Sequence, residues 1–220
     1  ITGYPSTQEG WGRVLLDNAL YFPGDDEKVI IRDVRNSSLD ALNTSETDEI
    51  VVTTMSVAMP WATHSDGPLD FAHVESAMGH AADFALGLAI AQPNRRVLCI
   101  NGDGSTLMSL GVLVILAQRP AANLTLVITE NGTYEVTGSQ PVPGADFIDY
   151  EQLCRGAGLQ RVYTIDNDAD FDAKLDQHFS EEGPVVFIWK IDKAEEPVPK
   201  PSKPIRERAH RLREALTGSA

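Results

Sequence analysis

The stretch RVLCINGDGSTLMSLGVLVILAQ, residues 96–118, decides the fold. It begins with an apolar run of strand length, passes through a turn with two glycines, and continues as a longer, mostly apolar segment. The same alternation recurs on both sides, with strands expected at 50–54, 71–74, 96–100, 123–129, 161–165 and 184–191 and helices at 79–91, 106–118, 150–157 and 169–179. Apolar strands that alternate with helices predict a doubly wound parallel α/β sheet with helices on both faces.

The two ends of the chain are less regular. We expect a helix at residues 7–20, a strand at 28–34 and a short helix at 38–42, and residues 43–70 are the hardest to interpret. Four prolines between residues 197 and 204 predict an extended connector. A charged helix at 205–216 follows, which we expect on the surface or on a partner rather than in the core. The predicted organisation is one domain over residues 1–192, then the connector and terminal helix over 193–220.

Composition and charge limit the function. Acidic residues outnumber Lys and Arg by 32 to 18, which gives a net charge of −14 and disfavours nucleic-acid binding. A bound phosphate must therefore be held locally, by a metal or by backbone amides. No apolar run approaches the roughly 20 residues of a membrane span. Cys99 and Cys154 stand far apart without metal-ligand spacing, so we expect a soluble, cytoplasmic protein with two reduced thiols.

Two polar turns follow neighbouring expected strands. Asp103 comes after the strand at 96–100, and Asn131 comes after the strand at 123–129. One helix and one strand separate them, and such a crossover returns the chain to the same edge of a parallel sheet. Their oxygen atoms suit Mg²⁺ or Ca²⁺, so the spacing predicts a metal–diphosphate site. The alternative is a turn aspartate and a capping asparagine in an ordinary βαβ unit.

These residues resemble the signature of thiamine diphosphate enzymes. The matching stretches are Gly102-Asp103-Gly104-Ser105 and Asn131, where the family often has two successive asparagines and this chain has Glu130 first. The resemblance implies Mg²⁺ and thiamine diphosphate as cofactors. It implies a metal bound by Asp103, the Asn131 side chain and the main-chain oxygen of Thr133, and cofactor contacts from Gly104, Ser105, Asn131, Thr133 and Tyr134.

The run ESAMGHA, residues 75–81, resembles the segment that supports the aminopyrimidine ring in that family. The resemblance implies that Met78 is a wedge beneath the cofactor and that Ser76 bonds the pyrimidine edge. Met78 as a simple core residue is the alternative. His80 is a candidate for cofactor or substrate contact, or a helix-start histidine bonded to a carbonyl. His64 and His73 are expected to be structural or surface residues.

With the loop at 131–141, these motifs resemble the sulfopyruvate and phosphonopyruvate decarboxylases over residues 71–159. In this family the glutamate that activates the cofactor lies on a separate domain, and no glutamate here has that context. The resemblance therefore implies the β subunit of a two-subunit 2-oxoacid decarboxylase whose active site is shared with an α subunit. We expect an α2β2 heterotetramer, and no residue of this chain is a certain catalytic residue.

Three alternatives stay open. The first is a carboligating, acetolactate-synthase-like subunit, and the second is the β subunit of a 2-oxoacid:ferredoxin oxidoreductase, which normally carries cysteine ligands for an iron–sulfur cluster. The third is a non-catalytic or regulatory module that keeps the fold. The acidic excess is awkward for a dianionic 2-oxoacid, which would need Arg or Lys from the partner.

Overall fold

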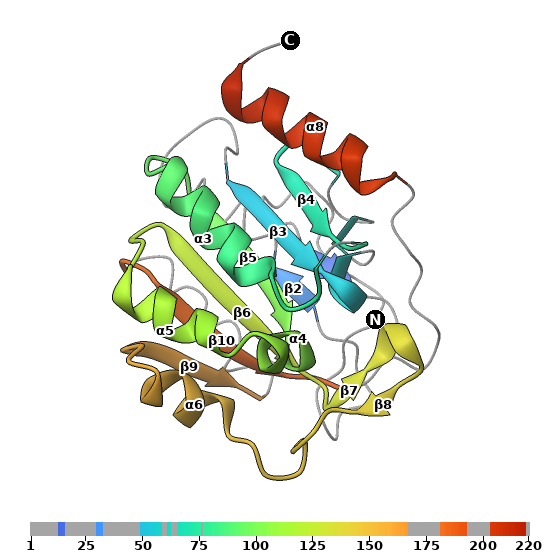
Figure 1. Cartoon of the computed structure of the whole chain (residues 1–220), viewed down its shortest axis with the longest axis vertical. Helices are drawn as coiled ribbons and strands as arrows, with labels where there is room; N and C mark the ends of the chain where they lie inside the picture. Colours follow the sequence, from blue (N-terminus) through green and yellow to red (C-terminus); the bar gives the residue numbers. More distant parts are fainter. Residues whose placement is uncertain are drawn as a thin grey trace.

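The computed structural model describes residues 13–15, 30–32, 49–58, 61–62, 66–75, 77–166, 181–192 and 203–218. Its centre is a six-stranded sheet with the order β4-β3-β5-β6-β10-β9 (Figure 1). Every neighbouring pair in this sheet is parallel, so the predicted doubly wound α/β fold is confirmed. The strands are β3 (Ile50–Thr54), β4 (Asp70–His73), β5 (Val97–Gly102), β6 (Leu124–Glu130), β9 (Arg161–Ile165) and β10 (Val185–Lys190).

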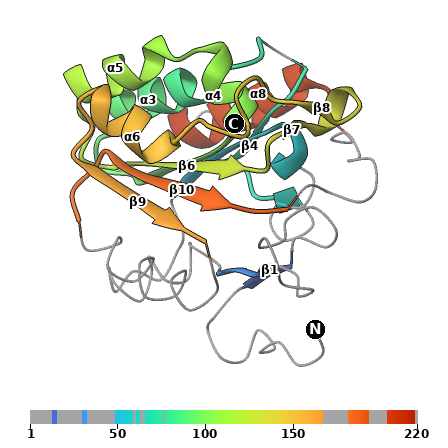
Figure 2. The same cartoon turned by 90° about the horizontal axis from the view of Figure 1, so that it is seen from below.

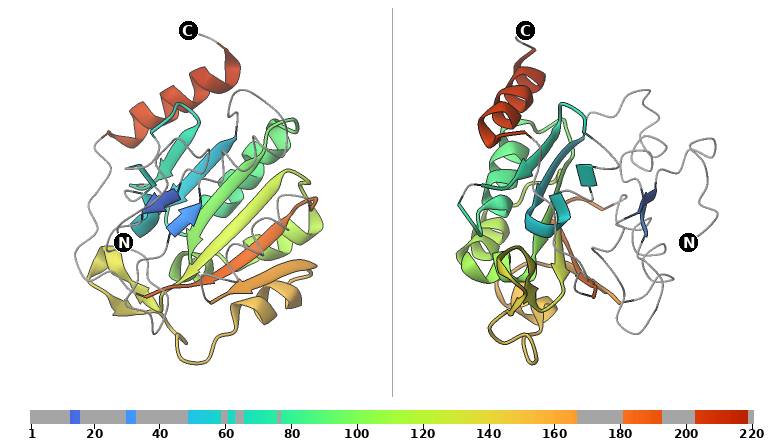
Figure 3. Two further views of the ribbon diagram at one scale, coloured as in Figure 1. Left: turned by 180° about the vertical axis from the view of Figure 1, so that it is seen from behind. Right: turned by 90° about the vertical axis from the view of Figure 1, so that its right-hand side faces the viewer.

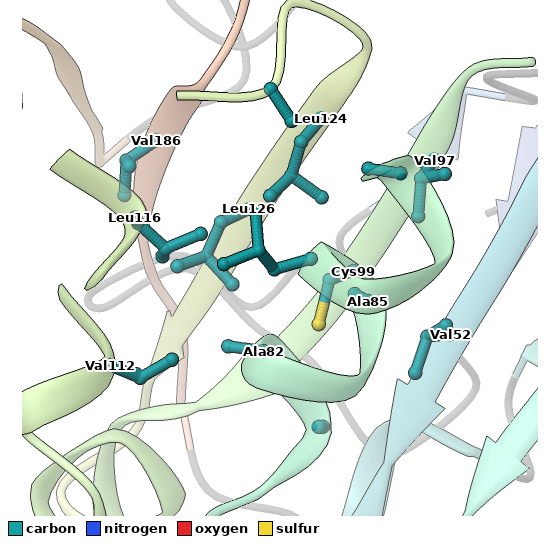
Figure 4. Packing of buried hydrophobic residues seen from close by; sticks show 14 of the residues in the cluster. Val52, Ala82, Ala85, Val97, Cys99, Val112, Leu116, Leu124, Leu126 and Val186 are labelled. Atoms are coloured by element: carbon teal, nitrogen blue, oxygen red, sulfur yellow. The ribbon is translucent and has the colours of Figure 1, made fainter. Parts of the chain in front are cut away.

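Four of the described helices cover one face of the sheet, as Figures 1 and 2 show. They are α3 (Ala81–Ala91), α4 (Asp103–Met108), α5 (Gly111–Gln118) and α6 (Tyr150–Gly156). The first core cluster lies between them and the sheet, where Cys99 of β5, Leu116 of α5 and Leu126 of β6 point toward one another (Figure 4). A fully buried leucine of this kind contributes about 2 kcal/mol to folding.

A second core cluster lies on the opposite face, because successive residues of a strand point to opposite sides. Leu98 and Phe187 belong to it, whereas their neighbours Cys99 and Val186 belong to the first cluster. Trp61 also belongs to it, and so does Val57 of the 3-10 helix η2 (Met55–Val57). The connection from β3 to β4 thus crosses on the opposite face from α3, as right-handed crossovers in opposite directions require.

Asn123 joins the end of α3 to the start of β6. Its side-chain nitrogen donates to the main-chain oxygens of Ala89, Gln92 and Arg95, at 3.1, 3.0 and 2.6 Å. The last carbonyls of a helix have no partner inside the helix, and here a side chain supplies one. This contact helps to fix the crossover that returns the chain from α3 toward the centre of the sheet.

Two helix predictions are corrected. Arg13–Leu15 is strand β1, paired antiparallel with β2 (Ile30–Arg32), so the helix expected at 7–20 is wrong at these residues and the strand at 28–34 is confirmed at 30–32. A short apolar run does not distinguish strand from helix, and a partner strand decides. The helix expected at 106–118 is two helices, α4 and α5, interrupted at Ser109 and Leu110 before Gly111, a poor helix former.

The remaining described elements lie near the ends of the sheet. A hairpin of β7 (Thr133–Tyr134) and β8 (Gln140–Pro141), with η3 (Glu135–Thr137) between them, occupies the stretch after β6. Helix α8 (Ile205–Thr217) lies beside the edge strand β4 (Figures 1 and 3). Most residues of α8 are at the surface, as expected, but Leu212 is buried in the first core cluster, so the helix also contributes to the core.

Three further expectations fall wholly or mostly outside the described residues, namely the helices at 38–42 and 169–179 and the proline-rich connector, whose residues up to 202 are not described. In the part of the chain that the structure describes, no helix is long and apolar enough to cross a bilayer.

Candidate functional site

A cleft opens at the carboxyl ends of β3, β5 and β6, the edge where parallel sheets bind ligands. It holds about 430 Å³ of empty space, part of it open to solvent. The lining comes from the turn after β3, the segment before α3, helix α4, and the chain from the end of β6 through η3. The residues are Met55, Ser56, Met78, Gly102, Asp103, Gly104, Ser105, Met108, Thr129, Asn131, Thr133, Tyr134, Glu135 and Val136.

Asp103 joins the two strand ends that the sequence predicted to meet. Its Oδ1 accepts a hydrogen bond from the Gly104 amide at 2.6 Å. Its Oδ2 accepts from the amides of Asn131 and Gly132, at 3.2 and 2.7 Å. Gly132 has a φ of +69°, a conformation that glycine adopts without steric cost. The carboxylate therefore fixes the loop after β6 against the start of α4.

The electrostatics of this carboxylate favour a cation beside it. Burial raises the pKa of Asp103 above its usual value, the three backbone amides oppose this rise, and the charge of Glu135 adds to it. Burial likewise raises the pKa of Glu130, with Lys190 on the neighbouring strand opposing the shift. A divalent cation would stabilise the ionised form of Asp103 within this negative surrounding.

The donor set fits Mg²⁺. Asn131 Oδ1 accepts from the amide of Thr133 at 2.9 Å and from its Oγ1 at 3.4 Å, which orients the side-chain oxygen. Carboxylate and carbonyl oxygens carry further lone pairs and are the hard ligands that Mg²⁺ prefers. Among the described residues no group of three or more His, Cys, Asp or Glu side chains is placed to hold a metal. One carboxylate with amide and main-chain oxygens is therefore the candidate set here.

Ser105 and Gly104 fit a phosphate ligand. The Ser105 hydroxyl is buried at the cleft and has no hydrogen-bond partner within the described structure, an arrangement that a ligand oxygen would relieve. A Cβ on Gly104 would lie 2.3 Å from the ring of Tyr134, so the absence of a side chain lets this ring pack on the first turn of α4. Tyr134 thereby forms one wall of the cleft.

Met78 reaches the cleft because Gly79 packs closely on α4. Gly79 has a φ of +85°, and a Cβ there would lie 2.9 Å from Cβ of Met108 and 3.1 Å from the Ser105 carbonyl. This contact holds the turn before α3 against α4 and leaves Met78 41% exposed at the cleft. Ser76, the other residue predicted in this segment, lies outside the described residues.

His73 and His80 do not line the cleft. Nδ1 of His80 lies 2.7 Å from Oδ2 of Asp83 near the surface, at the start of α3. His73 is buried with its ring 5.6 Å from that of Phe84, and burial lowers its pKa. His64 is outside the described residues. The structure thus brings the predicted metal and diphosphate residues together and leaves His80 away from them.

Met55 and Ser56 line the cleft and were not predicted. They follow β3, and Met55 has a φ of +49°, a strained conformation for a residue with a side chain. The strand at 50–54 was expected, and the rule that ligands bind beyond the carboxyl ends of parallel strands could have indicated these two residues. Their backbone conformation had no signal in the sequence.

Comparison with known proteins adds a family match. Residues 51–188 match the family described as thiamine pyrophosphate enzyme, C-terminal TPP binding domain. The chain is 38% identical over 120 residues to sulfopyruvate decarboxylase subunit beta of Methanothermobacter thermautotrophicus, which covers 54% of this chain and 60% of that protein. It is 31% identical over 119 residues to phosphonopyruvate decarboxylase of Streptomyces hygroscopicus, covering 54% of this chain and 29% of that protein.

Two further matches are more distant in function or sequence. The large subunit of acetolactate synthase isozyme 1 of Escherichia coli is 31% identical over 137 residues, covering 56% of this chain and 23% of that protein. The structure of 2-oxoglutarate:ferredoxin oxidoreductase from Magnetococcus marinus superposes with a TM-score of 0.59 at 16% identity, covering 77% of this chain and 62% of that chain. At this identity the likeness concerns the fold alone. The chain matches 60% or less of the length of each of these three curated relatives.

Proposed function

The chain belongs to the family of thiamine pyrophosphate enzyme C-terminal TPP-binding domains, and from this membership we propose that it is the β subunit of a two-subunit 2-oxoacid decarboxylase. The proposed cofactors are thiamine diphosphate and Mg²⁺, and the proposed substrates are of the sulfopyruvate or phosphonopyruvate type. The observation that carries the proposal is the junction of Asp103 with the Asn131–Gly132 backbone beside the Ser105 hydroxyl, which has no hydrogen-bond partner among the described residues.

In this proposal the two strand ends hold the metal and the diphosphate. Asp103, the side chain of Asn131 and the main-chain oxygen of Thr133 would bind Mg²⁺. Gly104, Ser105 and Tyr134 would contact the diphosphate, with Asn131 and Thr133 from the other side of the cleft. The acidic chain has no general attraction for anions, so these residues, which we call the diphosphate cradle, must supply the binding energy for the diphosphate.

The rest of the cleft orients the cofactor. Thiamine diphosphate, when bound, supplies the electron sink that decarboxylation of a 2-oxoacid requires. Met78 would support the cofactor from below, and Ser76, which lies outside the described residues, would bond the pyrimidine edge. The apolar side chains of Met55, Met108 and Val136 would exclude water from the same cleft.

The activating carboxylate is proposed to come from an α subunit. Glu135 is the glutamate that lines the cleft in the described part of the chain, and its charge acts on Asp103 at the diphosphate end. We therefore assign activation of the cofactor to a partner, in an α2β2 assembly in the cytoplasm. The cations that a sulfonate or phosphonate group needs are assigned to that partner too, because no Lys or Arg among the described residues lines the cleft.

Cofactor binding tests the site. Asp103→Ala removes the charged metal ligand, so calorimetric titration with thiamine diphosphate and Mg²⁺ should show affinity at least about 100-fold weaker. Asp146→Ala, which removes an exposed carboxylate in the loop after β8, is the matched control and should bind like the wild type. Unchanged affinity in Asp103→Ala would contradict the metal assignment.

Activity tests the subunit role. Without a partner, the chain should release no CO2 from 2-oxoacids. It should release CO2 when it is expressed together with its α partner. Sulfopyruvate, phosphonopyruvate and uncharged 2-oxoacids are compared. Full activity of the lone chain would refute the shared active site, and activity with uncharged 2-oxoacids only would refute the substrate class.

A carboligating reaction is the second candidate, favoured by the match to acetolactate synthase. Both reactions use the same cofactor and the same cradle. Analysis of the organic product separates them, since decarboxylation leaves an aldehyde and carboligation joins two carbon chains. An acetolactate-like product would replace the decarboxylase assignment.

A further inference from the structure

Helix α8 is anchored through a buried arginine as well as through apolar packing. Leu212 is buried in the first core cluster, and Arg208 is only 3% exposed. Buried arginines need polar partners, because the guanidinium group stays charged. The partners of Arg208 are main-chain oxygens: Nη2 donates to Val74 at 2.7 Å, and Nη1 donates to Lys203.

Val74 begins the segment that leads to the cleft. It follows the last residue of β4, and the next residue, Glu75, has a φ of +64°, which is strained for a side-chain-bearing residue. At the other end of the segment Gly79 packs against α4. Met78 lies between these two points and lines the cleft.

The segment between β4 and α3 is therefore held at two places. Gly79 holds its end by close backbone packing, and Arg208 holds its beginning by a charge-assisted hydrogen bond. Burial lowers the pKa of Arg208, and the nearby charge of Glu75 opposes this shift. A strained residue persists where surrounding contacts over-determine its conformation, and the bond from α8 is such a contact.

We propose that Arg208 is a positioning residue that fixes the start of the segment carrying Met78, so that the C-terminal helix supports the cofactor cleft from the edge of the sheet. The inference rests on the proposed function for its effect on turnover. The contact itself joins residues 134 positions apart in the sequence.

Arg211 provides a matched control on the same helix. It binds the loop before β4, with 2.7 Å between its Nη1 and Oδ1 of Asp66, and it also donates to the carbonyl of Asp70, the first residue of β4, at 3.3 Å. Arg211→Met should loosen α8 without removing the bond to Val74. Arg208→Met removes that bond and keeps an apolar side chain of similar length, and Arg208→Lys keeps the charge.

The experiment combines hydrogen exchange with kinetics on the full chain in complex with its partner. In Arg208→Met, amide exchange in peptides covering 74–80 should accelerate. The value of kcat should fall about tenfold, which is the effect of losing one charged hydrogen bond. The dissociation constant of thiamine diphosphate should stay within about twofold of the wild-type value. Arg211→Met should accelerate exchange at 66–70 and leave kcat unchanged. Arg208→Lys should recover most of the turnover. If Arg208→Met does not fold, Arg208→Gln, which removes the charge, serves as the test variant, with the same faster exchange and lower kcat expected.

A double-mutant cycle with Met78→Ala tests whether Arg208 acts through this segment. If it does, Arg208→Met lowers kcat by less than about twofold in the Met78→Ala background. Fully additive losses, equal kcat losses in Arg208→Met and Arg211→Met, or unchanged exchange at 74–80 would each overturn the positioning role. A wild-type complex that binds no thiamine diphosphate overturns the proposed function instead, and the exchange data still report on the contact.

Discussion

Replacing Gly104 by alanine should displace Tyr134 from the start of α4. A Cβ at this position would lie 2.3 Å from Cε1 and 2.7 Å from Cδ1 of the tyrosine ring. Ordinary contact begins at 3.4 Å, so the ring must move by about 1.1 Å (3.4 − 2.3). Gly104 has a helical conformation inside α4, so alanine fits the backbone and the clash concerns the ring alone.

Two opposing effects set the magnitude. Overpacking of this kind costs about 1–3 kcal/mol, and Gly→Ala inside a helix gains up to about 1 kcal/mol. The free energy of unfolding should therefore fall by about 0–3 kcal/mol. If Tyr134 covers the bound diphosphate, as proposed, the displaced ring should also weaken thiamine diphosphate binding by about tenfold or more.

The assay pairs urea unfolding with calorimetric titration of thiamine diphosphate in the presence of Mg²⁺. Gly87→Ala is the control, because a Cβ there meets nothing within 4 Å in the middle of α3. The decisive comparison uses Tyr134→Ala as background, in which Gly104→Ala should cost no further affinity. An equal loss with and without the tyrosine ring, or wild-type affinity in Gly104→Ala, would refute the steric argument.

Three other predictions address separate parts of the chain. Met78→Ala should lower turnover about tenfold and leave thiamine diphosphate affinity within about twofold of the wild-type value, because the diphosphate cradle remains. Wild-type turnover with a lower Tm would instead identify Met78 as a core residue. Asp149 caps α6 by accepting from the Gln152 amide, and this bond holds the pKa of its carboxyl below the usual value. The ionised cap stabilises the folded chain above pH ~4, and this stabilisation is lost as the pH falls through the lowered pKa. Asp149→Ala should therefore lower the free energy of unfolding in urea by roughly 1 kcal/mol at neutral pH and by less in acid. A loss that grows in acid would contradict this sign. Burial raises the pKa of the Cys154 thiol to about 12 and also raises that of Cys99, so neither should be alkylated in the native chain at about pH 8 and both should be alkylated in denaturant, as counted by mass spectrometry.

The central strands could be predicted because both of their faces are buried. Residues 50–52, 97–100 and 126–128 are apolar at successive positions, as a strand covered on both faces requires. The proximity of Asp103 and Asn131 could also be predicted from the sequence, because crossovers in parallel sheets have one hand and a short length. Their hydrogen bonds confirm that the two strand ends adjoin.

Other features depend on contacts between distant parts of the chain. The helix break at Ser109 and Leu110 lies inside a stretch whose apolar composition suits one long helix. The strained conformation of Met55 is imposed by its surroundings, and the bond from Arg208 to Val74 spans most of the described chain. Local propensity carries no information on such contacts, so a single sequence predicts the cradle better than the residues that support it.

The three backbone amides bound to Asp103 have a thermodynamic consequence. They join the start of α4 to the loop after β6 through the chain's own groups, with no ligand atom between them. The loss of conformational entropy of these two segments therefore belongs to the folding reaction and not to the binding reaction. Ligand affinity at this edge of the sheet is thus coupled to the local stability of one carboxylate junction, and conditions that open the junction weaken binding even while the six-stranded sheet stays folded.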